Sequence, residues 1–264
     1  MSANWYNEKK MVELFVAGLN NGVRGFDTAR EYGAEKKVGR AIKTALQETG
    51  LSRSDVFIQS RICNEELVAG ANISREVNKS LEKMGLEYFD CFMFHWPTPN
   101  CYIKAWNELI HEYETSNSIK SIGLCNCRKR HIEEMEAAKV KMLPQILQIE
   151  ITPFWQVNEL KSLCDEKRIK LQAFSPLCKM IRPIRENKTL LDIANNHHVS
   201  IAQVILRWHI QRGISPISSS SKVERIKTNF DIMNFFLSEK EMQKMSLLDC
   251  GYKYHLESST CFGF

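Results

Sequence analysis

The chain has 264 residues, of which 44% are hydrophobic and 25% are charged, and its formal net charge is +5. This length and composition are typical of one large globular domain and predict a single domain over residues 1–264. The mild positive charge fits an anionic ligand such as a phosphate. Because the sequence contains no basic helix or recognition module, it does not indicate nucleic acid binding.

Nine cysteines are scattered along the chain, and none forms a CxxC pair. This pattern predicts reduced thiols in a cytoplasmic protein and no metal site. The segment Met1–Glu13 lacks the apolar core of a signal peptide, and no apolar run approaches the roughly 20 residues of a membrane span. We therefore expect a cytoplasmic protein that does not contact membranes and is a monomer or weak dimer.

The predicted elements begin with a helix over about Glu8–Leu19. Seven short apolar runs follow, and each is predicted to be a buried parallel strand because it is continuous and ends in polar residues. The runs are Gly25–Asp27, Val56–Ser60, Asp90–His95, Ile119–Leu124, Ile146–Glu150, Ile169–Phe174 and Ile214–Ile217. The segments between them are predicted to be helical. Ile73–Met84 has an apolar face, and capping boxes at Ser200–Gln203 and Ser238–Glu241 indicate two further helix starts.

Strands that alternate with helices over this length favour a TIM-type (β/α)8 barrel in the α/β class. Only seven strands are recognisable, since Met1–Asn7 is too short and too polar to form the first one. An open barrel leaves two strand edges unpaired, and each buried unpaired backbone group costs roughly 1–3 kcal/mol. We therefore expect a gap that is wet or filled by another segment, most simply the aromatic C-terminal tail, and a reduced stability.

Polar side chains lie at nearly every predicted strand end, which is where α/β barrels carry their chemistry. In chain order, these strand ends carry Asp27, Ser60, Arg61, His95, Trp96, Cys125, Asn126, Gln148, Glu150, Phe174, Ser175 and Pro216. A purely structural barrel does not need such a set, so the sequence predicts an active site at this end.

Several of these residues belong to longer motifs. The segment Gly22–Gly39, which reads GVRGFDTAREYGAEKKVG, resembles the signature of the aldo-keto reductase family. Further family motifs match in the same order: FHWP around His95, SIGLCN ending at Asn126, QIE beginning at Gln148, AFSPL around Phe174 and ERIKTNF beginning at Glu224. The resemblance covers about residues 9 to 250. It implies reduction of an aldehyde or ketone to an alcohol, with NADPH as cofactor and NADH as the alternative.

The resemblance implies catalytic roles for Asp27, Tyr32, Arg61 and His95. Tyr32 matches the general acid, whose ordinary pKa of about 10 must be lowered by a nearby cation to be useful at neutral pH. The family's lysine position reads Arg61, which can pair with Asp27 through two hydrogen bonds but cannot lose its proton. A surface salt bridge is the alternative for Arg61. His95 would orient the substrate oxygen and share in proton transfer, and Trp96 is a candidate for the substrate pocket.

The resemblance also implies a set of cofactor contacts. Asn126 and Gln148 match the residues that bind the nicotinamide carboxamide, beside Cys125, which replaces a serine and is a weaker donor. Phe174 would stack on the nicotinamide. The full predicted set is Cys125, Asn126, Gln148, Phe174, Ser175, Pro216, Ser218, Ser219, Arg225 and Asn229.

At the phosphate end of the predicted cofactor site, only some residues of this chain match the family's phosphate-binding residues. The run Ser218–Ser221 would wrap a phosphate, with a flexible linker as the alternative interpretation. Ile217 occupies a position that is often basic in the family, so a modest NADPH preference is expected. The absence of a GxGxxG motif argues against a doubly wound dinucleotide fold.

Two departures from the family support a second hypothesis. Arg61 replaces the lysine, and the first strand and its following loop, which in the family touch the cofactor and substrate pocket, are not recognisable. The chain could then be a catalytically weak or inactive barrel that binds a nicotinamide cofactor and acts as a regulatory protein. Consumption of NADPH with a panel of small carbonyl substrates separates the two hypotheses.

Overall fold

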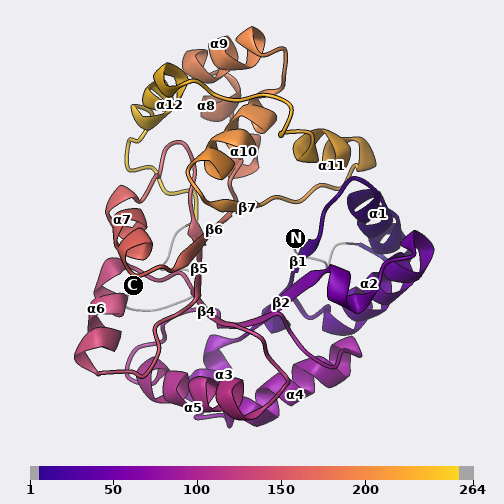
Figure 1. The fold of residues 1–264 in the computed structure, drawn as a ribbon, viewed down its shortest axis with the longest axis vertical. Coiled ribbons are helices and arrows are strands. Elements are labelled where there is room, and N and C mark those ends of the chain that lie inside the picture. Colours follow the sequence, from indigo (N-terminus) through magenta and orange to yellow (C-terminus); the bar gives the residue numbers. More distant parts are fainter. Residues whose placement is uncertain (1–5, 256–264) are drawn as a thin grey trace.

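In the computed structural model, which describes residues 6–255, a single sheet of parallel strands curls into a nearly closed barrel surrounded by helices (Figure 1). Each strand pairs with the next strand along the chain. The strands are β1 (Gly25–Asp27), β2 (Phe57–Ile62), β3 (Cys91–Phe94), β4 (Ile122–Cys125), β5 (Ile146–Glu150), β6 (Lys170–Phe174) and β7 (Ser215–Ile217). All seven predicted strands are confirmed, with ends shifted by a few residues.

The helices form the outer layer of the barrel (Figure 1). They are α1 (Glu8–Asn20), α2 (Glu35–Thr49), α3 (Asn64–Val68), α4 (Ile73–Met84), α5 (Tyr102–Thr115), α6 (Lys129–Ala137), α7 (Asn158–Glu166), α8 (Arg182–Arg185), α9 (Lys188–Asn196), α10 (Ile201–Gln211), α11 (Val223–Phe230) and α12 (Glu239–Ser246). Within residues 6–255, three short 3-10 helices, η2 (Arg30–Tyr32), η3 (Arg53–Asp55) and η4 (Cys178–Met180), lie in the connections.

Local sequence signals set the ends of several helices. The side chain of Asn72 accepts a hydrogen bond from the backbone N–H of Arg75 and so caps the start of α4, which ends at Gly85 in the left-handed region. The capping boxes predicted from Ser200 and Ser238 are both formed, at the starts of α10 and α12. The two predicted capping boxes and the predicted helix over Ile73–Met84 are therefore confirmed.

The strands have two different faces. Phe92 and Phe94 of β3 are fully buried in the large apolar core between the barrel and its helices. The alternate residues Cys91 and Met93 form a separate small cluster with Cys125. Because successive strand residues point to opposite faces, this cluster lies on the inner side of the sheet, where the polar residues of the candidate site are also found.

The barrel is open between β1 and β7. Each of these strands pairs on one side only, with β2 and β6 respectively, and within residues 6–255 no strand precedes α1. The expected open barrel is therefore confirmed for the described part of the chain. A cavity of about 550 Å³ runs along this seam and is lined by Phe15, Phe26, Ile217 and other side chains of both edges.

The expectation that the C-terminal tail fills the seam is wrong as far as the tail is described. The backbone N–H groups of Cys250 and Tyr252 donate to the carbonyl of Phe154, and those of Tyr254 and His255 donate to the carboxylate of Glu150. These contacts draw the tail to the ends of β5 and β6, away from the seam. Hydrogen bonds from N–H groups to a carboxylate are stronger than neutral ones, and the two made to Glu150 fix the tail at this position. Residues 256–264 lie outside the described part.

The seam is instead covered from outside by helices. α1 packs against α11 across it, as Figure 1 shows. Phe230 at the end of α11 lies over Gly22, where an added Cβ would be 2.9 Å from the Phe230 ring. Gly22 has a φ of +91°, so the turn that leads into β1 depends on a glycine both for its backbone conformation and for this contact. Helix packing thus closes the barrel where strand pairing does not.

Candidate active site

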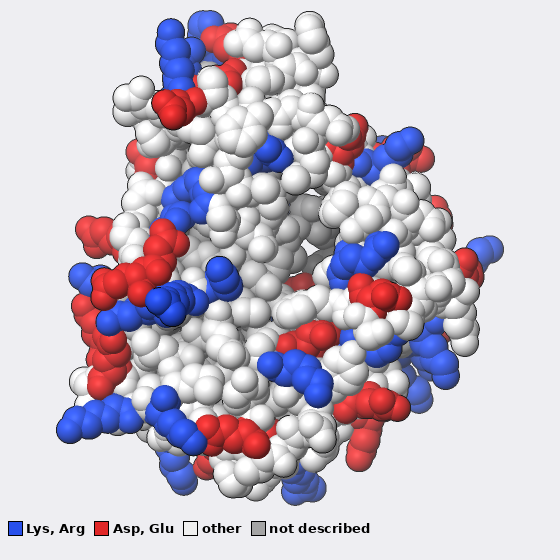
Figure 2. Space-filling model, viewed as in Figure 1, with Lys and Arg blue, Asp and Glu red and all other residues white. Residues whose placement is uncertain are grey.

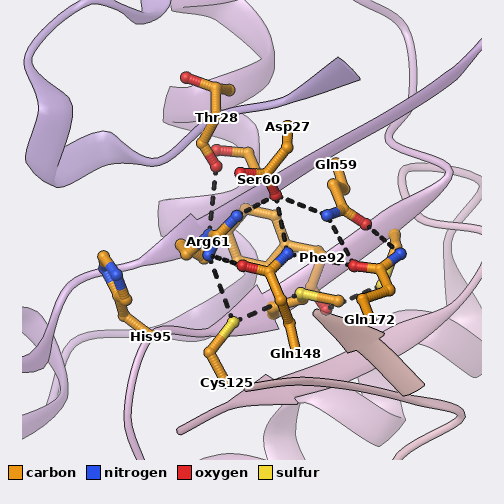
Figure 3. Close-up of polar contacts among 12 residues, drawn as sticks. Asp27, Thr28, Gln59, Ser60, Arg61, Phe92, His95, Cys125, Gln148 and Gln172 are labelled. Carbon is orange, nitrogen blue, oxygen red and sulfur yellow. Dashed lines mark hydrogen bonds and ion pairs between the residues drawn. The ribbon is translucent and has the colours of Figure 1, made fainter. Parts of the chain in front are cut away.

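Arg61 and Asp27 form a buried ion pair inside the barrel mouth (Figure 3). Asp27 ends β1 and Arg61 lies near the end of β2, and their side chains are 11% and 3% exposed. The guanidinium also donates from Nε to the carbonyl of Thr28 at 3.2 Å and from Nη1 to Oε1 of Gln148 at 2.6 Å. The alternative of a surface salt bridge at Arg61 is therefore wrong.

Both members of this pair are charged. Burial acts to raise the pKa of Asp27, but Arg61 and the amides of Gln148 and Gln59 outweigh it and lower that pKa below its ordinary value. Burial likewise acts to lower the pKa of Arg61, and Asp27 reverses the effect, so the pKa of Arg61 is raised. A buried ion pair, with Arg61 as its positive member, thus lies at the ends of β1 and β2.

Tyr32 and His95 lie together beside this pair. Tyr32 ends η2 and His95 directly follows β3, and their rings meet edge to face with centroids 6.1 Å apart. Burial raises the pKa of Tyr32 to about 12. Arg61 acts in the expected direction, lowering that pKa, but its effect is smaller than the cost of burial. The expectation that the cation makes Tyr32 more acidic is therefore wrong for its net effect.

Glu31 is a site residue that the sequence analysis missed. Its Oε2 lies 2.8 Å from Nδ1 of His95, an ion-pair distance, although the ring nitrogen is not aligned for a hydrogen bond. The contact with His95 is the largest cause that lowers the pKa of Glu31. A carboxylate directly before Tyr32 was the available signal in the sequence.

Three glutamines join the ion pair on the inner face of the barrel (Figure 3). The amide of Gln148 donates from Nε2 to Asp27 at 2.9 Å and to Gln172 at 3.1 Å. Gln59 and Gln172 exchange a reciprocal pair of amide hydrogen bonds, at 2.9 and 3.0 Å. Gln148 was predicted from the sequence, but Gln59 and Gln172 were not, because only strand alternation indicated their inward positions on β2 and β6.

The predicted nicotinamide contacts lie at the ends of β4 and β6. Cys125 is fully buried, and its thiol accepts a hydrogen bond from Arg61 Nη1 at 3.5 Å. Asn126 has a left-handed backbone, and its Nδ2 donates to the carbonyl of His95 at 3.0 Å. Phe174 ends β6, and Ser175 follows it. These residues and the catalytic candidates therefore share one end of the barrel.

The C-terminal tail reaches the same region. The ring of His255 lies 2.8 Å from Ser175 Oγ, measured from Nε2, and its centroid is 5.6 Å from that of Phe174. Glu150 is buried and accepts from the backbone of both Tyr254 and His255. The tail therefore covers part of the predicted cofactor site.

The predicted phosphate and adenosine residues lie along the seam cavity. Asp27, Pro216, Ser218, Ser219 and Asn229 all line it, and the face in Figure 2 is hollowed near its centre. The volume of about 550 Å³ is within the range of small-molecule and cofactor sites.

The remaining predicted site residues, Arg225 and Trp96 among them, do not line this cavity. Arg225 is exposed on α11, one helical turn before Asn229. Trp96 is buried beside His95 and does not line the cavity. Within residues 6–255, no helix has the length and apolar character that crossing a membrane requires.

Comparisons with known proteins agree on one family. The model described as "Aldo/keto reductase family" matches residues 2–249. The chain is 36% identical to the glyoxal reductase of Bacillus subtilis, over 92% of this chain and 85% of the relative, and 32% identical to the methylglyoxal reductase DkgA of Escherichia coli O157:H7, over 93% and 86%. An aldo/keto reductase structure from Brucella melitensis superimposes with a TM-score of 0.81 at 32% identity, covering 92% of this chain and 89% of that one.

Proposed function

Because the chain belongs to the aldo/keto reductase family, we propose that it reduces an aldehyde or ketone to an alcohol with NADPH as the electron donor. The observation that carries the proposal is the grouping of Tyr32 and His95, 6.1 Å apart, beside the buried Asp27–Arg61 pair at the strand ends. A carbonyl oxygen placed within reach of the Tyr32 hydroxyl and a ring nitrogen of His95 would have two hydrogen-bond partners.

The proton comes from Tyr32 in this proposal. Its pKa of about 12 keeps the phenol protonated throughout the neutral range, so the hydroxyl is always present as a donor. His95 orients the carbonyl oxygen, and Glu31 holds the imidazole through its contact with Nδ1. Arg61 contributes a fixed positive charge that favours the developing oxyanion. It does not relay a proton, because a guanidinium stays protonated.

The cofactor site is assembled from three parts. Asn126 faces the nicotinamide end, Phe174 offers an aromatic face beside it, and Ser218, Ser219 and Asn229 line the cavity that takes the phosphate and adenosine end. When bound there, the reduced nicotinamide supplies a hydride. Arg225 and Lys222 lie near the adenosine end and favour a 2′-phosphate, which supports NADPH over NADH.

The proposed substrate is a small carbonyl compound, and dicarbonyls are the first to test. Two relatives are named glyoxal reductase and methylglyoxal reductase, and Trp96, which follows His95 in the chain, is the candidate aromatic residue for the substrate. The experiment is the loss of NADPH absorbance with glyoxal, methylglyoxal and an aromatic aldehyde. Turnover that requires both protein and carbonyl supports the proposal, and its absence with every carbonyl refutes it.

A specific observation favours the second candidate, a cofactor-binding regulatory barrel. Arg61 directs its guanidinium to Asp27, Thr28 and Gln148, and burial leaves Tyr32 with a raised pKa. A weaker acid transfers its proton more slowly. NADPH binding, followed by tryptophan fluorescence, without turnover on any carbonyl would favour this candidate over the enzyme.

A further inference from the structure

Both N–H donors of the Gln148 side chain are engaged inside the barrel, and its oxygen accepts from a charged donor. Gln148 lies on β5 and is 1% exposed. Its Oε1 accepts from Arg61 at 2.6 Å, and its Nε2 donates to Asp27 at 2.9 Å and to Gln172 at 3.1 Å. A glutamine amide has two N–H donors, so neither donor remains for a ligand.

Arg61 causes this arrangement. The two terminal nitrogens of its planar guanidinium contact different residues: Nη2 pairs with Asp27 and Nη1 donates to Gln148. Arg61 thereby joins β1 and β5 across the barrel (Figure 3). A lysine ammonium is a compact point charge with a single nitrogen, so it does not span two partners as a guanidinium does. A lysine at this position could pair with Asp27 and leave Gln148 Oε1 without its charged donor.

Asn126 remains available where Gln148 does not. Its Nδ2 donates to the carbonyl of His95, and within residues 6–255 its Oδ1 accepts no hydrogen bond. An amide oxygen that retains its acceptor capacity can receive the N–H of a carboxamide.

We propose that Arg61 is a positioning residue that holds Gln148 away from the cofactor, so that in this chain the nicotinamide carboxamide is bound through Asn126 and not through Gln148. The inference rests on the proposed cofactor site. In this proposal Arg61 controls the affinity for the cofactor in addition to supplying a charge beside Tyr32. Replacing Arg61 with lysine, the family's residue, should free Gln148 to bind the cofactor.

The test measures the Kd of NADPH by quenching of tryptophan fluorescence, without any substrate. Gln148→Ala should change Kd by less than about twofold, because the amide does not contact the cofactor. Arg61→Lys should lower Kd about fivefold, the effect of one recovered neutral hydrogen bond. Adding Gln148→Ala to Arg61→Lys should abolish that gain. Arg53→Lys is the matched control, because Arg53 pairs with Asp90 at 2.7 Å outside the site, and it should leave Kd unchanged.

Asn126→Ala separates this inference from the proposed function. It should raise Kd about fivefold, whereas an unchanged Kd would overturn both the inference and the proposed placement of the nicotinamide. If Asn126→Ala weakens binding and Gln148→Ala weakens it equally, the cofactor site stands and the inference is overturned. The comparison of Asn126→Ala with Gln148→Ala leaves Arg61 unchanged, so it tests the inference even if Arg61→Lys does not fold. A Kd unchanged by a folded Arg61→Lys also overturns the inference.

Discussion

The carboxylate of Glu31 lies 2.8 Å from Nδ1 of His95, and the ring of its neighbour Tyr32 meets the same imidazole edge to face. Two consecutive residues of one short 3-10 helix therefore contact the same ring. Because η2 directly follows the strand that carries Asp27, a single loop delivers the proton donor, the carboxylate that holds the imidazole, and the partner of Arg61. The first prediction tests this contact.

Replacing Glu31 with Gln should lower kcat for carbonyl reduction by about threefold to tenfold and leave the Kd of NADPH unchanged, because a charged partner of His95 is lost. The lowered pKa of Glu31 keeps its carboxylate charged above its ordinary pKa of 4.5, so the contact weakens only as pH falls below that range. Steady-state kinetics from pH 5 to pH 8 measure the effect. Glu65→Gln, on the nearby helix α3, is the control. Equal rates for Glu31→Gln and the unaltered protein would contradict the role.

Tyr32→Phe should reduce turnover by roughly 10²- to 10⁴-fold with little change in cofactor affinity, since only the proton donor is removed. The raised pKa of Tyr32, about 12, means that the phenol stays protonated as pH rises through the alkaline range. The rate should therefore show no loss from tyrosine ionisation below about pH 10. A rate that falls with a pKa near 9 in the unaltered protein, and not in the variant, would contradict the assignment.

Removing Arg61 should destabilise the fold. Arg61→Met leaves Asp27 buried without its cation, and breaking such a pair costs about 3–5 kcal/mol of unfolding free energy. Urea denaturation measures the loss. Because the pKa of Asp27 is lowered, the pair stabilises the protein above the ordinary pKa of 3.8, and this contribution is lost as pH falls through the lowered value. The double variant Asp27→Asn with Arg61→Met should be more stable than Arg61→Met alone, and the reverse order would refute the charge argument.

Gly22→Ala should destabilise the protein by about 1–2 kcal/mol, because its φ of +91° is unfavourable for alanine and its Cβ would meet Phe230. Gly25→Ala is the matched control on the same edge of the seam, since a Cβ there meets no atom within 4 Å. Thermal melts of both variants measure the difference. Equal melting temperatures would show that the contact between the turn and α11 does not hold the seam closed.

Arg225→Ala should raise the Kd of NADPH about fivefold and leave that of NADH unchanged, because only NADPH carries the 2′-phosphate that a guanidinium can pair with. Arg225 is exposed and lies one turn from Asn229, which lines the cavity. Lys227→Ala, two residues further along α11, is the control for a general loss of positive charge. An unchanged ratio of the two dissociation constants would remove Arg225 from the cofactor site.

Much of the fold could be predicted because its signals are local. Short apolar runs ended by polar residues predicted every strand, and the capping boxes at Ser200 and Ser238 predicted where α10 and α12 begin. The strand ends then predicted Asp27, Arg61 and His95 as neighbours, since parallel strands in one barrel bring their carboxyl ends together. Hydrophobic periodicity and capping depend on residues a few positions apart, so the amino-acid sequence by itself determined these features.

Tertiary structure alone decided which partner each polar group found. Gln148 meets Asp27, which is 121 positions away in the chain, and Glu150 meets the backbone of His255, 105 positions away. Local sequence patterns involve residues a few positions apart and therefore do not predict contacts between residues so far apart in the chain. The net rise in the pKa of Tyr32 was equally hidden, because burial and the charge of Arg61 act in opposite directions and their balance depends on the packing around both side chains.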